Sequence, residues 1–317
     1  MPKLRGTVYN NIATEENLAK VNPDNLKLLD EWVMYLTAAS RSPQTIYNYI
    51  SDIRFFFVYL LQRCDNKFFG DIVPRDIVFF QTWCMNDLKL SNNRIRRLKD
   101  VVSSFSNYVE KFYKDDERLK DFKNITRVIG NPKREKSREE TELTDAEVKL
   151  IFEKLIDDCH YRTACLLALA LYGGLRKAEL VQIELATFEK SNITGSLYKS
   201  PHNITYKGGR KGTPYFLKHE VDRYIYLWKR ERRRMFRRYG EPSKEIQKML
   251  FLSRVENKWK VTQTQNMTYV AEFITQTMQK NGIDKVFYWE SARNYFEDYV
   301  KRTVKSEEER KLLLQNM

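Results

Sequence analysis

The sequence predicts a mainly α-helical protein with two folded parts joined by a polar segment. At 317 residues the chain is long for one average domain, and 42% of its residues are hydrophobic, which is enough to bury real cores. Apolar residues recur at helical spacing through the first part of the chain. Residues 124–142 are instead polar and charged and contain Gly130 and Pro132, so we expect an extended linker there.

The N-terminal part is predicted to be a helical bundle over residues 24–123, preceded by a mobile arm over residues 1–23 that shows little periodicity. No strand-like alternation precedes residue 125, which favours an all-helical domain. Serine or proline marks the start of three of the four helices, as is typical of helix N-termini. The expected helices run from Asn25 to Ala39, from Ser42-Pro43 through Leu60, from Pro74 to about Leu88, and from Ser91 to about Tyr113.

The C-terminal part, residues 143–317, is predicted to be mostly helical with a small sheet. Thr144 followed by Glu147 forms a capping box, and the apolar run Ala164–Leu171 fits a buried helix. Between Phe188 and Phe216, β-branched and aromatic residues surround a Gly208-Gly209 turn, so we expect a hairpin or a three-stranded sheet. Helix is expected from about Glu220 to the end, with breaks near Gly240 and Gly282.

The charge points to a polyanionic partner, most often nucleic acid. Lysine and arginine number 56 against 42 acidic residues, which gives +14 and a pI of about 9.4. The alternative is a surface charged for solubility. Mean hydropathy is −0.62, and we find no apolar run that could span a membrane and no secretory signal. The four cysteines lack CxxC spacing and are expected to be reduced, buried thiols of an intracellular protein.

The stretch Tyr172–Leu180 carries the most informative motif. A buried helix ends in a Gly-Gly turn, Arg176 follows, and a new amphipathic helix begins. An arginine at a helix N-terminus lets its guanidinium and nearby N–H groups grip a phosphate. The alternative is a left-handed turn with a surface arginine.

Together these residues resemble the tyrosine recombinases, the phage integrase family. Gly174-Leu175-Arg176-x-x-Glu179-Leu180 is similar to the first box of that family, and Leu143-Thr144-x-x-Glu147 is similar to the opening of its catalytic domain. The second helix of the family's core-binding domain is resembled by a third stretch, Ser42-Pro43-x-Thr45-x-x-x-Tyr49-x-x-Asp52-Ile53-x-x-Phe56. The resemblance spans residues 25–317. It implies a two-domain tyrosine recombinase fold, with an N-terminal helical core-binding (SAM-like) bundle and a C-terminal, mostly helical catalytic-type domain with a small β-sheet.

This sequence retains the residues that stand for the phosphate-binding half of the family's site, and it differs from the family at other positions. Arg176 and Arg293 stand in the places of the two arginines, and Lys207 in that of the catalytic lysine on a hairpin. Glu290 occupies the place of a histidine and Asn294 that of a further histidine in many members. We find no tyrosine where the family has its nucleophile. Tyr295 and Tyr299 lie too close to Arg293 and are expected to be packing residues.

These departures leave alternatives open. The leading hypothesis is a catalytically inactive, sequence-specific double-stranded DNA-binding protein, a phage or prophage transcriptional regulator such as a repressor, located in the cytoplasm with the nucleoid. The alternative is an active recombinase or integrase whose tyrosine lies beyond residue 317. A third possibility is an accessory factor with little sequence preference. Self-association on DNA is compatible with each. The three histidines are dispersed, so no metal or other cofactor is expected.

The candidate DNA contacts are basic or polar residues of both parts. In the family the second and fourth helices of the first domain line the major groove. Phosphate contacts would supply most of the affinity, and base contacts the specificity. The run Lys229–Arg238 holds seven basic residues in ten, and its alternative is a solvated helix face. The predicted contacts are Thr45, Asn48, Arg94, Arg96, Arg97, Lys99, Lys133, Arg134, Arg176, Lys207, Arg210, Lys211 and Arg293, with Lys136 and Arg138 in the same basic linker as Lys133 and Arg134.

Overall fold

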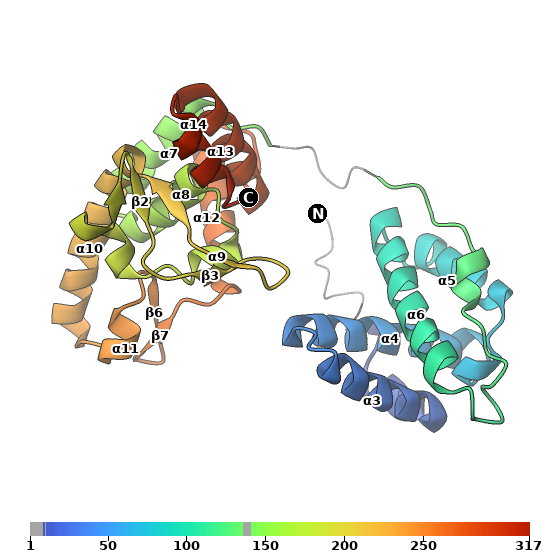
Figure 1. Cartoon of the computed structure of the whole chain (residues 1–317). Helices are drawn as coiled ribbons and strands as arrows, with labels where there is room; N and C mark the ends of the chain where they lie inside the picture. Colours follow the sequence, from blue (N-terminus) through green and yellow to red (C-terminus); the bar gives the residue numbers. More distant parts are fainter. Residues whose placement is uncertain (1–8, 10, 136–140) are drawn as a thin grey trace. The chain divides into compact units, whose positions relative to one another are not determined.

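The computed structural model describes Tyr9 and residues 11–135 and 141–317, which belong to two compact units. Unit 1 comprises residues 1–139 and unit 2 residues 140–317 (Figure 1). Each unit has its own hydrophobic core. Among the described residues, none of the helices has both the length and the apolar character needed to cross a membrane.

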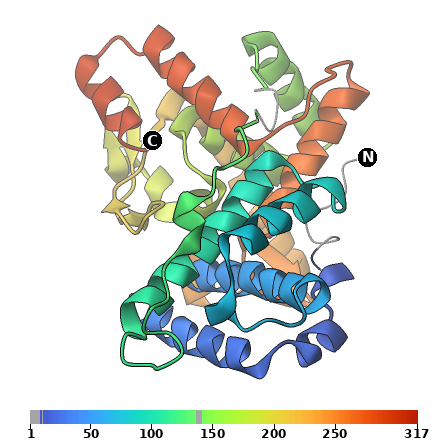
Figure 2. The same ribbon diagram turned by 90° about the vertical axis from the view of Figure 1, so that its right-hand side faces the viewer.

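Unit 1 is a helical bundle, as predicted, and its principal helices lie side by side in blue to blue-green in Figure 2. The expected caps are present: Ser42 Oγ accepts the Thr45 amide and Ser91 Oγ accepts the Arg94 amide. The core is rich in aromatic rings, such as the fully buried Trp32. The helices are α2 (Glu15–Lys20), α3 (Pro23–Ala38), α4 (Pro43–Arg63), α5 (Pro74–Asn86) and α6 (Asn92–Phe112), with 3₁₀ turns η1 (Phe69–Asp71) and η2 (Ile125–Val128).

The segment before α3 differs from the mobile arm expected over residues 1–23. Residues 15–20 form α2, which Thr14 caps by accepting the Asn17 amide. Ala13 and Val21 are buried in the core of unit 1. The short apolar residues that flank α2 therefore anchor it, although they are too few to show a periodic pattern. Residues 1–8 and 10 lie outside the described residues.

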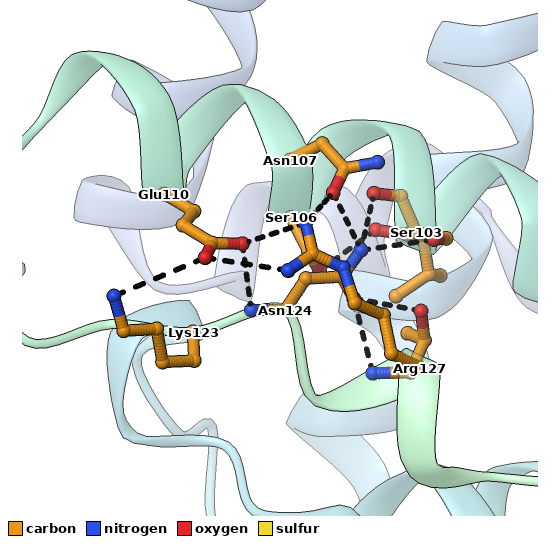
Figure 3. A network of polar contacts seen from close by, with 9 residues as sticks. Ser103, Ser106, Asn107, Glu110, Lys123, Asn124 and Arg127 are labelled. Atoms are coloured by element: carbon orange, nitrogen blue, oxygen red, sulfur yellow. Dashed lines mark hydrogen bonds and ion pairs between the residues drawn. The ribbon is translucent and has the colours of Figure 1, made fainter.

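The first part of the expected linker is folded onto unit 1 (Figure 3). The Asn124 side chain is buried and donates to Ser103 and to Asn107 Oδ1 on α6, at 2.9–3.1 Å. Glu110 on α6 accepts the Asn124 amide and pairs with Arg127 at 3.0 Å. The boundary expected at residue 124 was therefore wrong, because a buried asparagine within the polar stretch ties this segment to the bundle.

Unit 2 is built around the buried helix α8 (Tyr161–Gly173). The capping box of α7 (Asp145–Asp157) is confirmed, because the Glu147 amide donates to Thr144 Oγ1 and the Thr144 amide donates to Glu147 Oε2. Helices α10 (Lys218–Tyr239) and α13 (Trp289–Thr303) both pack on α8. The remaining helices are α9 (Lys177–Leu180), α11 (Lys244–Gln247), α12 (Asn266–Lys280) and α14 (Glu307–Leu314), with 3₁₀ turns η3 (Leu185–Phe188) and η4 (Lys190–Asn192).

The strands of unit 2 form a three-stranded antiparallel sheet and two hairpins. The sheet has the order β1-β2-β5, and the predicted Gly208-Gly209 turn closes the hairpin of β3 and β4. The hairpin of β6 and β7 was not predicted, since we expected helix from Glu220 onward. The strands are β1 (Ile193–Thr194), β2 (Leu197–Lys199), β3 (Ile204–Thr205), β4 (Lys211–Gly212), β5 (Tyr215–Leu217), β6 (Leu252–Val255) and β7 (Lys258–Val261).

All four cysteines are free thiols, but they are not all buried. Cys84 and Cys165 are buried, Cys64 is partly buried and Cys159 is exposed. Burial raises the pKa of the Cys84 thiol to about 12 and also raises that of Cys165. The expectation of buried thiols was thus wrong for Cys159, which ends a turn with a positive φ of 59°.

Candidate nucleic-acid interface

Arg176 is held at the start of α9 by the carboxylate of Glu179. α8 is followed by its C-cap residue Gly174, which has a left-handed φ of +66° and lies close to the Phe296 ring. The Arg176 amide donates to Glu179 Oε2 at 2.7 Å, and Arg176 Nη1 lies 3.5 Å from Glu179 Oε1. Glu179 is 1% exposed, so its negative charge is fixed beside the arginine. The Gly-Gly turn therefore sets the backbone, and Glu179 orients the guanidinium.

Arg293 lies on α13, and its guanidinium shares a hydrogen-bond acceptor with that of Arg176. Arg293 is only 3% exposed, and its Nε and Nη1 atoms are buried without a hydrogen-bond partner among the described residues. Burial lowers the pKa of Arg293, and the positive charge of Arg176 lowers it further. A buried guanidinium with unused N–H groups favours an anion beside it. The structure thus brings together the two arginines that the sequence singled out.

Both arginines donate to one acceptor, the main-chain oxygen of Met317. Arg293 Nη2 lies 2.8 Å from this oxygen and Arg176 Nη1 lies 3.4 Å from it. The neighbouring Asn316 is fully buried, and its amide nitrogen donates to the carbonyls of Gly173 and Tyr215, both at 2.7 Å. The sequence had not pointed to these C-terminal residues as part of the site. The one local indication is a single polar residue, Asn316, that follows an apolar helix.

Lys207 lies on the hairpin of β3 and β4, as the sequence predicted. Its amide donates to Glu179 Oε1 at 3.3 Å, so the carboxylate that orients Arg176 also anchors this hairpin. Lys207 and Lys211 are exposed. Arg210 stacks on the Tyr206 ring and donates to the Gln315 carbonyl at 2.8 Å, which places the yellow hairpin beside the C-terminal residues (Figure 2).

The residues that depart from the family pattern lie on the same helix as Arg293. Glu290 is exposed one turn before Arg293, and Asn294 is partly exposed. Tyr295 and Tyr299 are directed to other partners: their hydroxyls donate to Asp145 at 2.9 Å and to Glu220 at 2.6 Å. Burial raises the pKa of both tyrosines. Their predicted role as packing residues is confirmed.

In unit 1, two of the predicted contacts are paired with a buried carboxylate. Asp52 on α4 is 3% exposed. Its Oδ1 lies 2.6 Å from Arg94 Nη2, and its Oδ2 lies 3.1 Å from Arg97 Nε, both on α6. Asp52 therefore joins the two helices that the resemblance assigns to the major groove. Thr45 and Asn48 lie on the same helix as Asp52, where Thr45 Oγ1 hydrogen-bonds Ser42 and Asn48 accepts weakly from Gln44.

Two further predicted contacts hold the segment after η2. Lys99 is 6% exposed and donates to the Ile129 carbonyl, and burial lowers its pKa. Its assignment as a DNA contact is corrected, because its ammonium group is used inside unit 1. Arg96 Nη1 donates to the Pro132 carbonyl at 2.8 Å. Lys133 and Arg134 follow and are exposed, whereas Lys136 and Arg138 lie outside the described residues.

Within the described ranges, no three His, Cys, Asp or Glu side chains are grouped so that they could hold a metal ion. The candidate residues described above are mainly arginines, lysines and side chains with amide or hydroxyl groups. Such groups bind anions through charge and N–H donors.

Solved structures with a similar fold include integrases and recombinases. The chain is 14% identical to a lambda integrase tetramer bound to a Holliday junction, with 94% of this chain and 80% of that chain covered and a TM-score of 0.60. It is 12% identical to the Tn1549 transposon integrase in complex with circular intermediate DNA, with 91% of each chain covered and a TM-score of 0.55. The chain has the tyrosine recombinase fold, and the predicted fold class is confirmed.

A sequence relative points the same way. Over 222 residues the chain is 29% identical to the SPbeta prophage-derived recombinase-like protein YomM of Bacillus subtilis (strain 168). The match covers 69% of this chain and 66% of that protein's length, slightly less than two thirds. No family model matches the chain.

Proposed function

We propose that this protein binds double-stranded DNA sequence-specifically, holds a backbone phosphate between Arg176 and Arg293, and carries out no strand transfer. The observation that carries the proposal is the convergence of these two guanidinium groups on one acceptor oxygen. A phosphate oxygen is a hydrogen-bond acceptor, as the main-chain oxygen of Met317 is.

The unused donors of Arg293 support a phosphate. Arg293 Nε and Nη1 are buried and unpartnered in the described structure, and an unpaired buried donor costs about 1–3 kcal/mol. A backbone phosphodiester has two non-bridging oxygens, which offer acceptors to both guanidinium groups at once. Lys207 brings a further exposed positive charge on the hairpin, which its main-chain amide ties to the carboxylate that orients Arg176.

The residue types on α13 support binding without catalysis. Proton transfer to or from a reacting oxygen needs a group that titrates near the working pH, as histidine does. Here Glu290 and Asn294 stand in the places where the family has histidines. An exposed carboxylate at position 290 repels a scissile phosphate. We therefore assign the protein a regulatory role, as a transcriptional repressor of a phage or prophage.

Site selection tests the binding proposal. Selection from a random duplex library with the full chain is expected to yield a defined site, bound 10³-fold or more tighter than random duplex, the range typical of specific binders. Arg176→Ala and Arg293→Ala are each expected to weaken binding, while Lys280→Ala on α12 serves as a control of equal charge loss. Equal affinity for selected and random duplex would contradict sequence specificity and favour an accessory factor.

A nicked duplex of the selected site tests for chemistry. Such a substrate traps a covalent protein–DNA adduct when a nucleophile attacks the phosphate, and no adduct is expected here. An adduct would establish the second candidate, an active recombinase whose nucleophile lies beyond residue 317. That candidate is favoured by one observation, the retention of Arg176, Arg293 and Lys207 around Glu179.

Repression itself is tested with a promoter that carries the selected site. Expression of the wild-type protein is expected to lower reporter output, and Arg176→Ala to restore it. Unchanged output with a protein that still binds the site would remove the repressor assignment while leaving DNA binding in place.

A further inference from the structure

Helix α10 carries an arginine-rich surface that the proposed phosphate site does not use. Its buried residues Val221, Ile225, Trp228 and Arg232 face the core of unit 2. On the opposite face, exposed residues recur at helical spacing. We call this row the arginine stripe: Arg223, Tyr226, Arg230, Arg233 and Arg237, at positions i, i+3, i+7, i+10 and i+14. At 1.5 Å per residue the row is about 21 Å long.

The charge of the stripe is not neutralised within the described part of the chain. Arg234, beside the stripe, pairs with Glu231 at 3.3 Å. None of the ion pairs of the described residues involves Arg223, Arg230, Arg233 or Arg237. Placing basic residues in the last turn of a helix is favourable because of the helix dipole, which accounts for Arg237 but not for Arg223 or Arg230. A row of unpaired arginines therefore matches an external polyanion.

The C-terminal half of α10 is held rigidly by the hairpin of β6 and β7. The Phe236 ring packs edge-on against Trp259 of β7, with ring centroids 5.2 Å apart. Trp259 Nε1 donates to the Gly240 carbonyl at 2.8 Å, just after the helix ends. Arg254 of β6 stacks on Tyr239 at 4.3 Å. These contacts fix the backbone of the stripe, so its guanidinium groups lose less freedom on binding than those of a loop would.

The stripe faces away from the paired arginines. α10 and α13 both pack on α8, and the stripe lies on the side of α10 opposite its buried face. Figure 1 draws α10 along the edge of unit 2 that is far from α9 and the C-terminal residue. A straight duplex held at Arg176 and Arg293 therefore passes on the other side of α8.

We propose that the arginine stripe binds the phosphate backbone of a second duplex segment while the first lies at Arg176 and Arg293. A duplex is the occupant that fits best, because its phosphates continue for the whole 21 Å and because arginine is the preferred residue for phosphate. The alternative, an acidic protein, is an outcome of the tests below. The proposal rests on the proposed DNA-binding function and extends it from one duplex to two.

The first test is the salt dependence of binding to a random-sequence 20-bp duplex. Each phosphate contact contributes roughly 0.9 to the slope of log K against log salt. The triple variant Arg230→Gln, Arg233→Gln, Arg237→Gln is therefore expected to lower the slope by roughly 2 to 3. The matched control Lys149→Gln, Lys280→Gln, Lys305→Gln removes the same charge from exposed positions off the stripe and is expected to leave the slope almost unchanged. Equal slopes for the stripe variant and wild type would overturn the proposal.

The second test asks for two duplexes at once. Wild-type protein bound to an immobilised duplex is expected to capture a fluorescent 20-bp duplex from solution. The stripe variant is expected to stay on the immobilised duplex but to lose this capture, while the control variant keeps it. Undiminished capture by the stripe variant would overturn the second-duplex proposal. If the stripe variant binds DNA like wild type in both tests, the second-duplex proposal is overturned, and an acidic protein becomes the favoured partner of the stripe.

The two proposals fail in different ways. If Arg176→Ala and Arg293→Ala leave DNA binding unchanged while the stripe variant weakens it, the proposed phosphate site is wrong and the stripe remains a DNA surface. If the arginine-pair variants weaken binding and the stripe variant does not, only the stripe proposal is overturned.

Discussion

Asp52 on α4 and Arg94 on α6 form an ion pair with 2.6 Å between Oδ1 and Nη2, and the carboxylate is 3% exposed. Arg97 reaches the other oxygen of the same carboxylate. One buried charge thus joins α4 to α6 and holds the side chains of two arginines in place.

We expect Asp52→Asn to destabilise unit 1, because a hydrogen-bonded charge is worth about 1.5–3 kcal/mol. Chemical denaturation followed by tryptophan fluorescence measures the loss. Asp87→Asn is the control, since its pair with Arg63 is about half exposed and such pairs contribute at most about 1 kcal/mol. Equal effects of the two substitutions would show that the buried pair does not stabilise the bundle.

Asn316→Ala is expected to loosen the C-terminal residues from unit 2. The substitution leaves the buried carbonyls of Gly173 and Tyr215 without their donor, at a cost of about 1–3 kcal/mol for each group left unpaired. Hydrogen exchange of the peptide 313–317 should speed up, while Gln315→Ala should leave it unchanged because only the Gln315 main chain is used. Protection retained in Asn316→Ala would contradict this anchoring role.

Glu290→Gln is expected to raise the affinity for duplex DNA several-fold, because it removes a negative charge one turn from Arg293. The effect should shrink as salt rises, since exposed charges are screened. Fluorescence anisotropy at 50 and 200 mM salt measures it, and Glu153→Gln on the exposed side of α7 is the control. Unchanged affinity at low salt would place the bound phosphate away from position 290.

Gly174→Ala is expected to destabilise unit 2 by about 2–4 kcal/mol. Its φ of +66° disfavours a side chain, and a Cβ would lie 2.3 Å from Phe296 Cδ1. Gly130→Ala is the matched control, because its Cβ would meet nothing within 4 Å. Thermal unfolding compares the two variants, and similar midpoints would refute the steric requirement.

The stabilising effect of Asp145 is expected to disappear in acid. The Arg302 guanidinium hydrogen-bonds this carboxyl and holds its pKa below the usual 3.8. A pKa that is lower in the folded state stabilises the protein above about pH 4, and the contribution is lost as the pH falls below that value. Asp145→Asn should therefore be slightly less stable than wild type at pH 7, by less than about 1 kcal/mol because the pair is exposed, and equally stable near pH 2. Urea denaturation at both pH values checks this, and a difference that persists in acid would contradict it.

Helix positions could be predicted closely because caps and apolar spacing are local signals. Ser42-Pro43, Ser91 and Thr144 each begin a helix where the sequence indicated one. The paired arginines were found through their resemblance to a family motif, and the structure brings their guanidinium groups together. The pairing of Asp52 with Arg94 and Arg97 could not be predicted from local signals, because it joins residues that are 42 and 45 positions apart in the sequence.

The missed elements have weak or ambiguous local signals. β6 and β7 are four residues each and meet at Glu256-Asn257, which both have positive φ without the glycine that usually marks such a turn. The buried Lys99 looked like any other basic residue of α6 in the sequence. Only the three-dimensional path of residues 124–132 shows that its ammonium is used to hold the main chain.

The exposed Cys159 gives the molecule a natural attachment point for a probe. Cys84 and Cys165 are buried and their raised pKa values keep them as unreactive thiols at neutral pH, so a maleimide dye should favour Cys159. Its thiol accepts a hydrogen bond from the Tyr161 hydroxyl at 3.3 Å, at the start of α8, the helix on which α10 packs. If the arginine stripe binds a second duplex as proposed, we expect the fluorescence of a dye at Cys159 to change when that duplex is added in solution.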